Sequence, residues 1–319
     1  MAGVTDYAFR ELCASLAPIA TTTEMVSSKG LIYGDKKSHL LMQIAPMEHQ
    51  ARIQLFGSES EIMARAAAEA EKVPGVTGLD VNMGCPIGKI AGSGDGSALM
   101  KDIPRAAAIV RAMRTATALP VSVKFRKGWD SGQVNCVEFA LAMEDAGADA
   151  LCVHGRTKTQ MYSGHSDFAA IAAVKKAVRV PVTASGDIFD AESALECRRK
   201  TGADTFMVGR GAFGNPWLCA QVLAALEGRP VPELPPLEQR LETARAQIFR
   251  AAESKGEKIA SLEARKHLAW YLRGTREAAR FRGWIMKVES LADVERVIRD
   301  IVRYLEETQD MAPHGSGEW

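Results

Sequence analysis

One thiol, Cys85, follows a short apolar segment and lies between two residues at which the chain must turn. Residues 79–82 have the composition of a short buried strand, and Gly84 and Pro86 flank the cysteine. A glycine-rich stretch then leads into a helical pattern that begins near Ser97. Most cysteines are small buried hydrophobes, but a cysteine at a strand end beside glycine and proline favours a reactive thiol.

Short apolar runs alternate with alanine-rich helical patterns up to about residue 217. This alternation is typical of βα units and predicts a parallel sheet. The expected strands are residues 19–25, 53–56, 79–82, 121–126, 150–154, 180–185 and 206–210. The expected helices include residues 61–72, 103–115, 137–146 and 168–178.

Polar side chains recur where the expected strands end. They are Glu24, Gln54, Asn82, Lys124, His154, Asp187 and Arg210. An α/β fold of the (β/α)8 TIM-barrel type gathers such ends around one site. A doubly wound sheet, the alternative, usually binds its ligand at a single switch point, so the pattern favours the barrel.

The sequence predicts one barrel followed by a helical bundle. Seven strands are expected where a barrel needs eight, and residues 1–6 resemble the loop after a strand, so we expect most of the first strand to be absent from this sequence. Residues 1–228 are expected to form the barrel, and the proline-rich residues 229–236 a linker. Helical patterns in residues 237–309 predict three or four packed helices. Residues 310–319 are expected to be a flexible tail.

Composition argues against several classes of protein. The chain of 319 residues has a net charge of +1, no apolar run long enough to span a membrane and no signal-peptide pattern. Its six cysteines include no Cys-x-x-Cys pair, so we expect no metal site. We expect a cytoplasmic monomer with reduced thiols, no membrane association and no DNA partner.

The charge is unevenly distributed. Residues 265–287 contain seven basic residues and one acidic residue, with Trp270, Tyr271 and Trp284 among them. A basic surface with aromatic side chains suits an RNA backbone and unstacked bases. A solvated helix face is the alternative.

Two glycine-containing turns follow the last two expected strands. They are Ser185-Gly186-Asp187 and Gly209-Arg210-Gly211. Loops at these positions commonly bind phosphate in barrels, because glycine allows close backbone approach and arginine can donate two parallel hydrogen bonds. The alternative is that these are ordinary turns, but the occurrence of such a turn after both strands favours a phosphate-binding site.

Three further polar residues interrupt apolar strands. Lys124 could place a fixed positive charge beside an anionic cofactor ring, or form a Schiff base. His154 is equally consistent with a structural hydrogen bond and a cofactor contact. The Gln54 amide can donate and accept, which suits a ring edge with alternating carbonyl and N–H groups or the neighbouring backbone.

The chain resembles the tRNA-dihydrouridine synthases over nearly its whole length, and looks closest to the bacterial B type. The motifs that carry the resemblance are AGVTDYAFR at 2–10, EMVSS at 24–28, IQLFGS at 53–58, DVNMGCPIGKI at 80–90, GSALM at 96–100, VKFRKGW at 123–129, VHGRTKTQMYSG at 153–164, SGDI at 185–188, VGRGAFGNPW at 208–217 and ARKHLAWYL at 264–272. The family is flavin-dependent, so the resemblance implies FMN as cofactor, NADPH as electron donor and tRNA as partner.

The resemblance also implies roles for individual residues. Cys85 would be the general acid that protonates C5 of uracil, while hydride passes from reduced FMN to C6. The flipped base would be held by Asn82, Lys89 and Arg126. FMN would be bound by Met1, Ala2, Gln54, Lys124, His154, Ser185, Gly186, Asp187, Gly209 and Arg210. tRNA would be bound by Arg265, Lys266 and Tyr271.

Two departures from the family pattern stand out. Of the family's Ala-Pro-Met-Ala-Gly segment on the first strand, only Met1-Ala2-Gly3 is present, and Ser185 stands where the family usually has Asn. Three other functions compete with the synthase. They are a flavin barrel that acts on a free pyrimidine, as dihydroorotate dehydrogenases do, a Schiff-base lyase using Lys124, and a non-catalytic tRNA-binding module.

Overall fold

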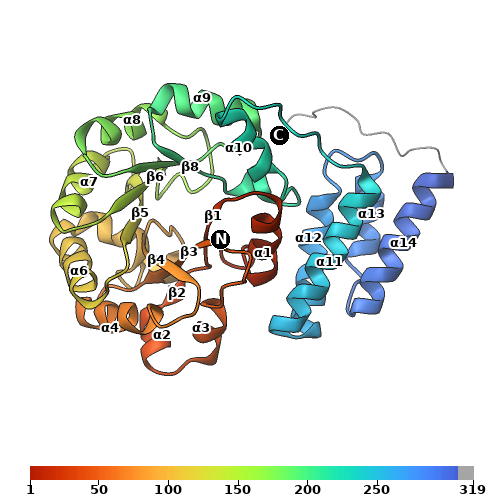
Figure 1. Ribbon diagram of the computed structural model, residues 1–319, viewed down its shortest axis with the longest axis horizontal. Coiled ribbons are helices and arrows are strands. Elements are labelled where there is room, and N and C mark those ends of the chain that lie inside the picture. Colours follow the sequence, from red (N-terminus) through yellow and green to blue (C-terminus); the bar gives the residue numbers. More distant parts are fainter. Residues whose placement is uncertain (308–319) are drawn as a thin grey trace.

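Parallel strands form one curved sheet surrounded by helices, and further helices lie beside it (Figure 1). This computed structural model describes residues 1–307. The strands follow the order β1-β3-β4-β5-β6-β7-β8, and β2 pairs with β3 outside this path. All pairs of named strands are parallel. The predicted TIM-barrel class with C-terminal helices is therefore confirmed.

Strands and helices alternate along the chain as the apolar periodicity predicted. The strands are β1 Ala20–Thr22, β2 Val26–Ser27, β3 Gln50–Phe56, β4 Val76–Met83, β5 Val121–Gly128, β6 Ala150–Thr157, β7 Val182–Ser185 and β8 Thr205–Met207. The helices that accompany them are α1 Tyr7–Leu16, α2 Ser28–Ile32, α3 Lys36–Leu41, α4 Ser60–Ala70, α5 Gly88–Ala91, α6 Ile103–Ala116, α7 Cys136–Asp145, α8 Phe168–Ala177, α9 Ala191–Thr201 and α10 Leu218–Leu226. Two 3-10 helices are η1 Gly96–Lys101 and η2 Arg210–Ala212. The C-terminal helices are α11 Leu237–Lys255, α12 Glu257–Tyr271, α13 Ala278–Ile285 and α14 Leu291–Glu307.

Some strand boundaries differ from the prediction for local reasons. The segment expected as one strand, 19–25, forms two strands, β1 and β2. Thr22 pairs with Arg52 on β3 and Val26 with Leu55, so this segment has one residue more than β3 over the same stretch, and the extra residue interrupts the ladder. The strand expected over 180–185 begins at Val182, after Pro181, which has no N–H group for the ladder. The strand expected over 206–210 ends at Met207.

The strands alternate between apolar side chains that face the helices and polar side chains that face the inside of the barrel. This alternation follows from the two-residue repeat of a strand. The fully buried apolar residues of β4 and β5 are Leu79, Val81, Met83, Val121, Val123 and Phe125. The residues between them are Asp80, Asn82, Ser122 and Lys124. The same pattern that builds the core therefore directs polar groups toward one interior site.

The two ends of the sheet are β1 and β8, and within the described part of the chain no strand ladder joins them. An N-terminal turn lies at this opening. The N–H group of Gly3 donates a hydrogen bond to the carboxylate of Glu24, just after β1. The Met1 sulfur lies 4.0 Å from the position that a Cβ would take on Gly209, just after β8. The turn therefore contacts both edges of the opening at the carboxyl ends of the strands.

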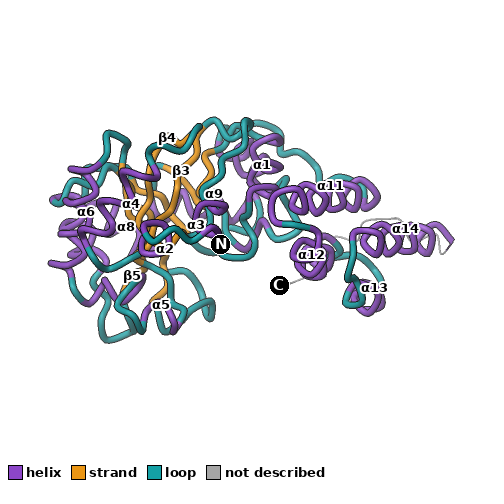
Figure 2. Tube along the Cα trace, turned by 90° about the horizontal axis from the view of Figure 1, so that it is seen from below, coloured by secondary structure: helices purple, strands orange, loops and turns teal. Residues whose placement is uncertain are grey.

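Helices α11 to α14 enclose a second apolar core beside the barrel (Figure 2). Ring stacking between Phe213, after β8, and Trp270, on α12, joins the two parts at a centroid distance of 4.3 Å. Arg250 on α11 also pairs with Glu11 on α1 at 2.6 Å. The helices are thereby fixed to the side of the barrel where the sheet is open.

The predicted division into 1–228, 229–236 and 237–309 stays a prediction. Residues 229–236 contain no helix or strand, and α11 begins directly after them. The tail expected over 310–319 lies outside the described residues. Among the helices of residues 1–307, none has the length and apolar character that crossing a membrane requires.

Candidate active site

Cys85 lies just after β4, in a turn that the side chain of Asn82 organises. The amide oxygen of Asn82 accepts hydrogen bonds from the N–H groups of Gly84, at 3.1 Å, and Cys85, at 2.9 Å. The Cys85 carbonyl accepts a hydrogen bond of 3.2 Å from the N–H of Ser97. Gly96 has φ +57°, and a Cβ there would lie 3.0 Å from that carbonyl oxygen. The half-buried thiol is thus held from both sides by backbone contacts.

Burial raises the pKa of the Cys85 thiol, while a backbone hydrogen bond from Ile87 and the positive charge of Arg126 oppose the rise. A thiol whose pKa is raised stays protonated at neutral pH. Cys85 is therefore suited to donate a proton and poorly suited to attack as a thiolate.

A chain of buried hydrogen bonds leads from the barrel interior to this turn. Asp80 accepts from the Ser122 hydroxyl at 2.6 Å and from the Gln54 amide nitrogen at 2.6 Å. The Gln54 amide oxygen accepts from Asn82 Nδ2 at 2.8 Å. Each predicted amide, Gln54 and Asn82, therefore has partners within the protein. Asn82 is positioned by Gln54 and in turn positions Cys85.

Arg126 connects the Cys85 turn with the loop after β6. Its Nε donates to the carbonyl of Gly84 at 2.8 Å, and its Nη1 donates to the carbonyls of Thr157 and Met161, both at 2.9 Å. Desolvation lowers the pKa of Arg126 to about 10, so the guanidinium is still charged at neutral pH. Arg126 is thus beside the thiol, as the sequence analysis expected of a residue near the base.

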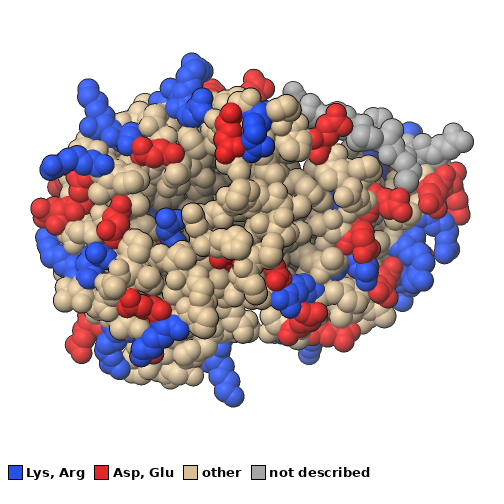
Figure 3. Space-filling model, viewed as in Figure 1, with Lys and Arg blue, Asp and Glu red and all other residues tan. Residues whose placement is uncertain are grey.

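Lys124 and His154 face the same interior on neighbouring strands. Lys124 is in register with Asn82 on one side and Cys152 on the other. Desolvation, together with the positive charges of Lys124 and three arginines, lowers the pKa of His154 to about 2. His154 is therefore neutral, and its Nε2 atom is buried without a hydrogen-bond partner. In Figure 3 the face over the barrel is hollowed at its centre, and basic atoms lie inside the hollow.

Arg156 is the largest fully buried side chain of the described residues. Its Nη2 lies 2.7 Å from the carboxylate of Asp187, and its Nε donates to the carbonyl of Ser163 at 3.0 Å. Its Nη1 is buried without a partner. Arg210 lies 3.6 Å from the same carboxylate. The Asp187 side chain therefore positions two arginines, and the contact with the cofactor that the family resemblance implies for it stays a prediction.

The turn after β7 contains two consecutive residues in the left-handed region, Gly186 with φ +113° and Asp187 with φ +54°. A Cβ on Gly186 would lie 2.7 Å from the Ser166 hydroxyl and 3.5 Å from His154 Nε2. Only glycine fits there without displacing these groups. Ser185 is buried at the end of β7, in register with His154. The turn and the unpartnered histidine are thus side by side.

The remaining predicted residues lie at the rim or beyond it. Met1 and Gly209 lie together at the opening of the sheet, whereas Ala2 is exposed. Lys89 is exposed on α5, in the segment that follows Cys85. Their placement at the carboxyl ends of the strands agrees with the predicted side of the barrel.

On α12 the structure separates the three predicted tRNA contacts. Arg265 donates to the carbonyl of Val288 at 2.8 Å, and Lys266 pairs with Glu263 at 3.3 Å, and both are partly exposed. Tyr271 is fully buried. Its hydroxyl donates to Gln247 at 2.8 Å. Its side chain is not available to RNA in this conformation, and we no longer propose it as a contact.

The other aromatic residues of this stretch also serve packing. Trp270 stacks on Phe213, as described above, and Trp284 packs against Phe281 at 5.4 Å and Tyr304 at 6.1 Å. Trp270 and Trp284 are nevertheless partly exposed, so the proposed RNA surface on the helices is basic and keeps these two aromatic residues but not Tyr271.

The model of the dihydrouridine synthase family matches residues 1–307. The chain belongs to this family. A probable tRNA-dihydrouridine synthase 1 of Synechocystis sp. is 40% identical over 294 residues, which are 92% of this chain and 82% of the relative. The tRNA-dihydrouridine synthase B of Vibrio vulnificus is 39% identical over 283 residues, 88% of this chain and 87% of the relative. A probable tRNA-dihydrouridine synthase of Rickettsia conorii is 37% identical over 314 residues, which are 98% of this chain and 94% of the relative.

The predicted family resemblance is confirmed, with B-type synthases among the relatives. Dihydrouridine synthases are oxidoreductases, so the predicted enzyme class is confirmed as well. Two buried residues of the site, Asp80 and Arg156, were assigned no role from the sequence. Asp80 precedes Asn82 by two residues and so shares its side of the strand, which was a usable signal. Arg156 pairs with a residue 31 positions away, and no sequence pattern announces such a contact.

Proposed function

We propose that this dihydrouridine synthase uses FMN and NADPH to reduce uridines of tRNA to 5,6-dihydrouridine. The observation that carries the proposal is a protonated thiol, Cys85, held at the mouth of a barrel whose interior presents positive charge and unpartnered buried donors. A thiol of this kind can protonate a carbon atom as hydride arrives at its neighbour. The family membership and the names of the relatives support tRNA as the substrate.

The interior suits an anionic cofactor with a phosphate. His154 Nε2 and Arg156 Nη1 are buried polar atoms without partners, and such atoms are rare unless a ligand or water satisfies them. Gly186 keeps the space beside His154 open, since a side chain there would fill it. FMN would be held by these groups together with Lys124 and Arg210. When bound and reduced, FMN supplies the hydride that C6 of uracil receives.

The residues of the chain perform the remaining tasks. Cys85 donates its proton to C5, and Asn82 keeps the thiol in place through the Cys85 N–H. Lys124 and Arg126 supply positive charge near the uracil ring, which becomes anionic when hydride arrives. In a site with little water, this positive charge lowers the free energy of the charged ring. A stacked base is out of reach, so the uridine must be turned out of its helix into the mouth.

A flavin barrel that acts on a free pyrimidine is the second candidate. It needs the same thiol and the same cofactor site, but it leaves helices α11 to α14 and their basic residues without a role. Activity on tRNA combined with little activity on free uridine would separate the two functions.

The purified protein is expected to be yellow, with about one FMN per chain, and to convert uridine to dihydrouridine in tRNA from a strain that lacks this gene. Mapping of dihydrouridine by reverse-transcription stops identifies the position. A colourless protein that cannot be reconstituted with FMN contradicts the cofactor proposal. Unmodified tRNA after incubation with reduced, flavin-loaded enzyme contradicts the substrate proposal.

The pH profile follows from the direction of the Cys85 pKa shift. Because burial raises this pKa, the general acid stays protonated to higher pH than an ordinary thiol, whose pKa is about 8.5. The rate of tRNA-dependent flavin reoxidation is expected to stay constant from neutral pH through that value and to fall only above it. Single-turnover rates with pre-reduced enzyme measure this, and a half-maximal rate at or below pH 8.5 contradicts it.

A further inference from the structure

Trp129, the first residue after β5, is contacted by two lysine side chains. The ammonium of Lys101 is 3.9 Å from the centroid of the indole ring, and that of Lys158 is 4.6 Å from it. The Lys158 N–H donates to the Gly128 carbonyl, and the Thr159 N–H to the Trp129 carbonyl, both at 3.0 Å. The loops after β4, β5 and β6 thus contribute one residue each to a single cluster.

The acidic residues that are nearest along the chain have other partners. Asp102 accepts from the N–H of Arg105 at 3.1 Å and pairs with its guanidinium at 3.2 Å. Asp130 accepts from the N–H of Gly132 at 2.8 Å. No ion pair among residues 1–307 includes Lys101 or Lys158.

Two like charges over one ring repel each other. A cation–π contact at an exposed site is worth only about 0.5–1 kcal/mol. An anion between the two ammonium groups would remove the repulsion. Because lysine charge already lies over the indole, the ring is poorly placed to stack on a base, and the cluster suits a phosphate group.

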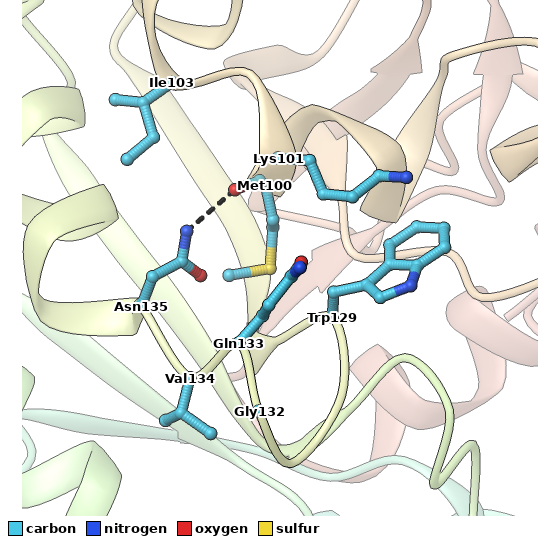
Figure 4. A pocket seen from close by; sticks show the side chains of 8 residues that line it. All are labelled: Met100, Lys101, Ile103, Trp129, Gly132, Gln133, Val134 and Asn135. Carbon is cyan, nitrogen blue, oxygen red and sulfur yellow. Dashed lines mark hydrogen bonds between the residues drawn. The ribbon is translucent and has the colours of Figure 1, made fainter.

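A recess of about 500 Å³ adjoins the cluster (Figure 4). Its lining residues are Met100, Lys101, Ile103, Trp129, Gly132, Gln133, Val134 and Asn135. Asn135 Nδ2 donates to the Met100 carbonyl at 2.8 Å and joins the two walls. The recess is open to solvent and borders the cluster at Lys101 and Trp129.

The cluster and the helical bundle lie on opposite sides of the barrel mouth. In Figure 1, β5 and β6 are on the side of the barrel that faces away from α11 to α14. Cys85 is close to the cluster along the chain of contacts, because the Cys85 carbonyl accepts a hydrogen bond from Ser97 in η1, the element that ends with Lys101. A substrate that reaches both surfaces must cross the barrel mouth, where Cys85 lies.

We propose that Lys101, Trp129 and Lys158 form a second RNA-backbone contact, at which a phosphodiester of the substrate tRNA lies between the two ammonium groups. The inference rests on the proposed function. Together with the basic residues of the bundle, this contact fixes the tRNA at two points on opposite sides of the barrel mouth. A macromolecule held in this way has a defined direction across the mouth.

The test is tRNA binding by the double variant K101Q/K158Q of the full chain, measured without turnover over about 50–300 mM salt. Each lost phosphate contact lowers the slope of log affinity against log salt by roughly 0.7–0.9. Since both lysines contact the same phosphodiester, the slope is expected to fall by about 0.7–0.9, with binding about tenfold weaker at the lowest salt. The matched control is K72Q/K200Q, which removes two exposed lysines paired with Glu69 and Glu196 on α4 and α9. The control is expected to keep the parent slope.

A slope equal to that of the parent, or an equal fall in the control, overturns the inference. So does a rise in the KM for NADPH with unchanged tRNA binding, which would assign the cluster to the dinucleotide. Trp129→Leu keeps both charges and is expected to weaken tRNA binding, because the lysines lose the ring that gathers them. Since the tRNA-binding measurements need no turnover, a parent enzyme that binds tRNA but forms no dihydrouridine would contradict the proposed function alone.

Discussion

Replacing Cys85 with alanine slows the reoxidation of reduced flavin by tRNA by about 10²–10⁴-fold, the usual cost of losing a positioned general acid. Hydride arrival at C6 leaves negative charge on the uracil ring until C5 receives a proton, and no other acid is held at this turn. FMN content and flavin reduction by NADPH are expected to be nearly unchanged. Stopped-flow absorbance of pre-reduced enzyme mixed with tRNA measures the step.

Two further variants separate a catalytic thiol from a packing one. Cys85→Ser is expected to recover little activity, because a hydroxyl is a far weaker acid than a thiol. Cys136→Ala is the control, since Cys136 is buried in the barrel core and outside the site. That variant is expected to lose stability while keeping its rate of reoxidation per folded molecule. A parent rate in Cys85→Ala would show that another group delivers the proton.

The elements of the barrel follow from local patterns and were predictable. Residues 79–83 alternate apolar and polar side chains, which both defines β4 as a strand and directs Asp80 and Asn82 inward. The spacing of apolar residues along α12 also predicts which side chains of this helix are buried. Ala264, Leu268 and Tyr271 follow one another at four and three residues along α12, and all three are buried. This spacing marks one face of a helix, so the burial of Tyr271 was within reach of the sequence.

Other parts of the site depend on contacts that no local pattern encodes. The Asn82 amide could have bound a base or the backbone, and only the three-dimensional turn decides that its oxygen accepts from Gly84 and Cys85. Asp187 in the turn after β7 suggested a phosphate loop, yet its carboxylate pairs with Arg156. Such pairings arise when strands distant in sequence become neighbours in the sheet, so they follow from the tertiary structure.

Arg156→Met is expected to lower the free energy of unfolding by about 3–5 kcal/mol, the range for breaking a buried ion pair by removing one partner. The loss leaves the Asp187 carboxylate without its closest cation, at 2.7 Å, and leaves the Ser163 carbonyl without its donor. Urea unfolding measures the change. Because the Nη1 of Arg156 is buried without a partner, and Arg156 follows His154 by two residues on β6, the variant is expected to lose FMN affinity beyond what its stability explains.

Arg10→Met is the matched control for that second effect. Arg10, on α1, is another buried arginine, paired with Glu48 at 2.8 Å, and its other hydrogen bonds go to the carbonyls of Gln43 and Thr5. Its loss is expected to reduce stability by a similar amount and to leave the dissociation constant for FMN of the folded protein close to that of the parent. Equal flavin loss in both variants would mean that Arg156 acts through folding alone. An unfolding free energy of Arg156→Met equal to that of the parent would contradict the importance of the Arg156–Asp187 pair, and would show that Arg210, 3.6 Å from the same carboxylate, compensates for the lost cation.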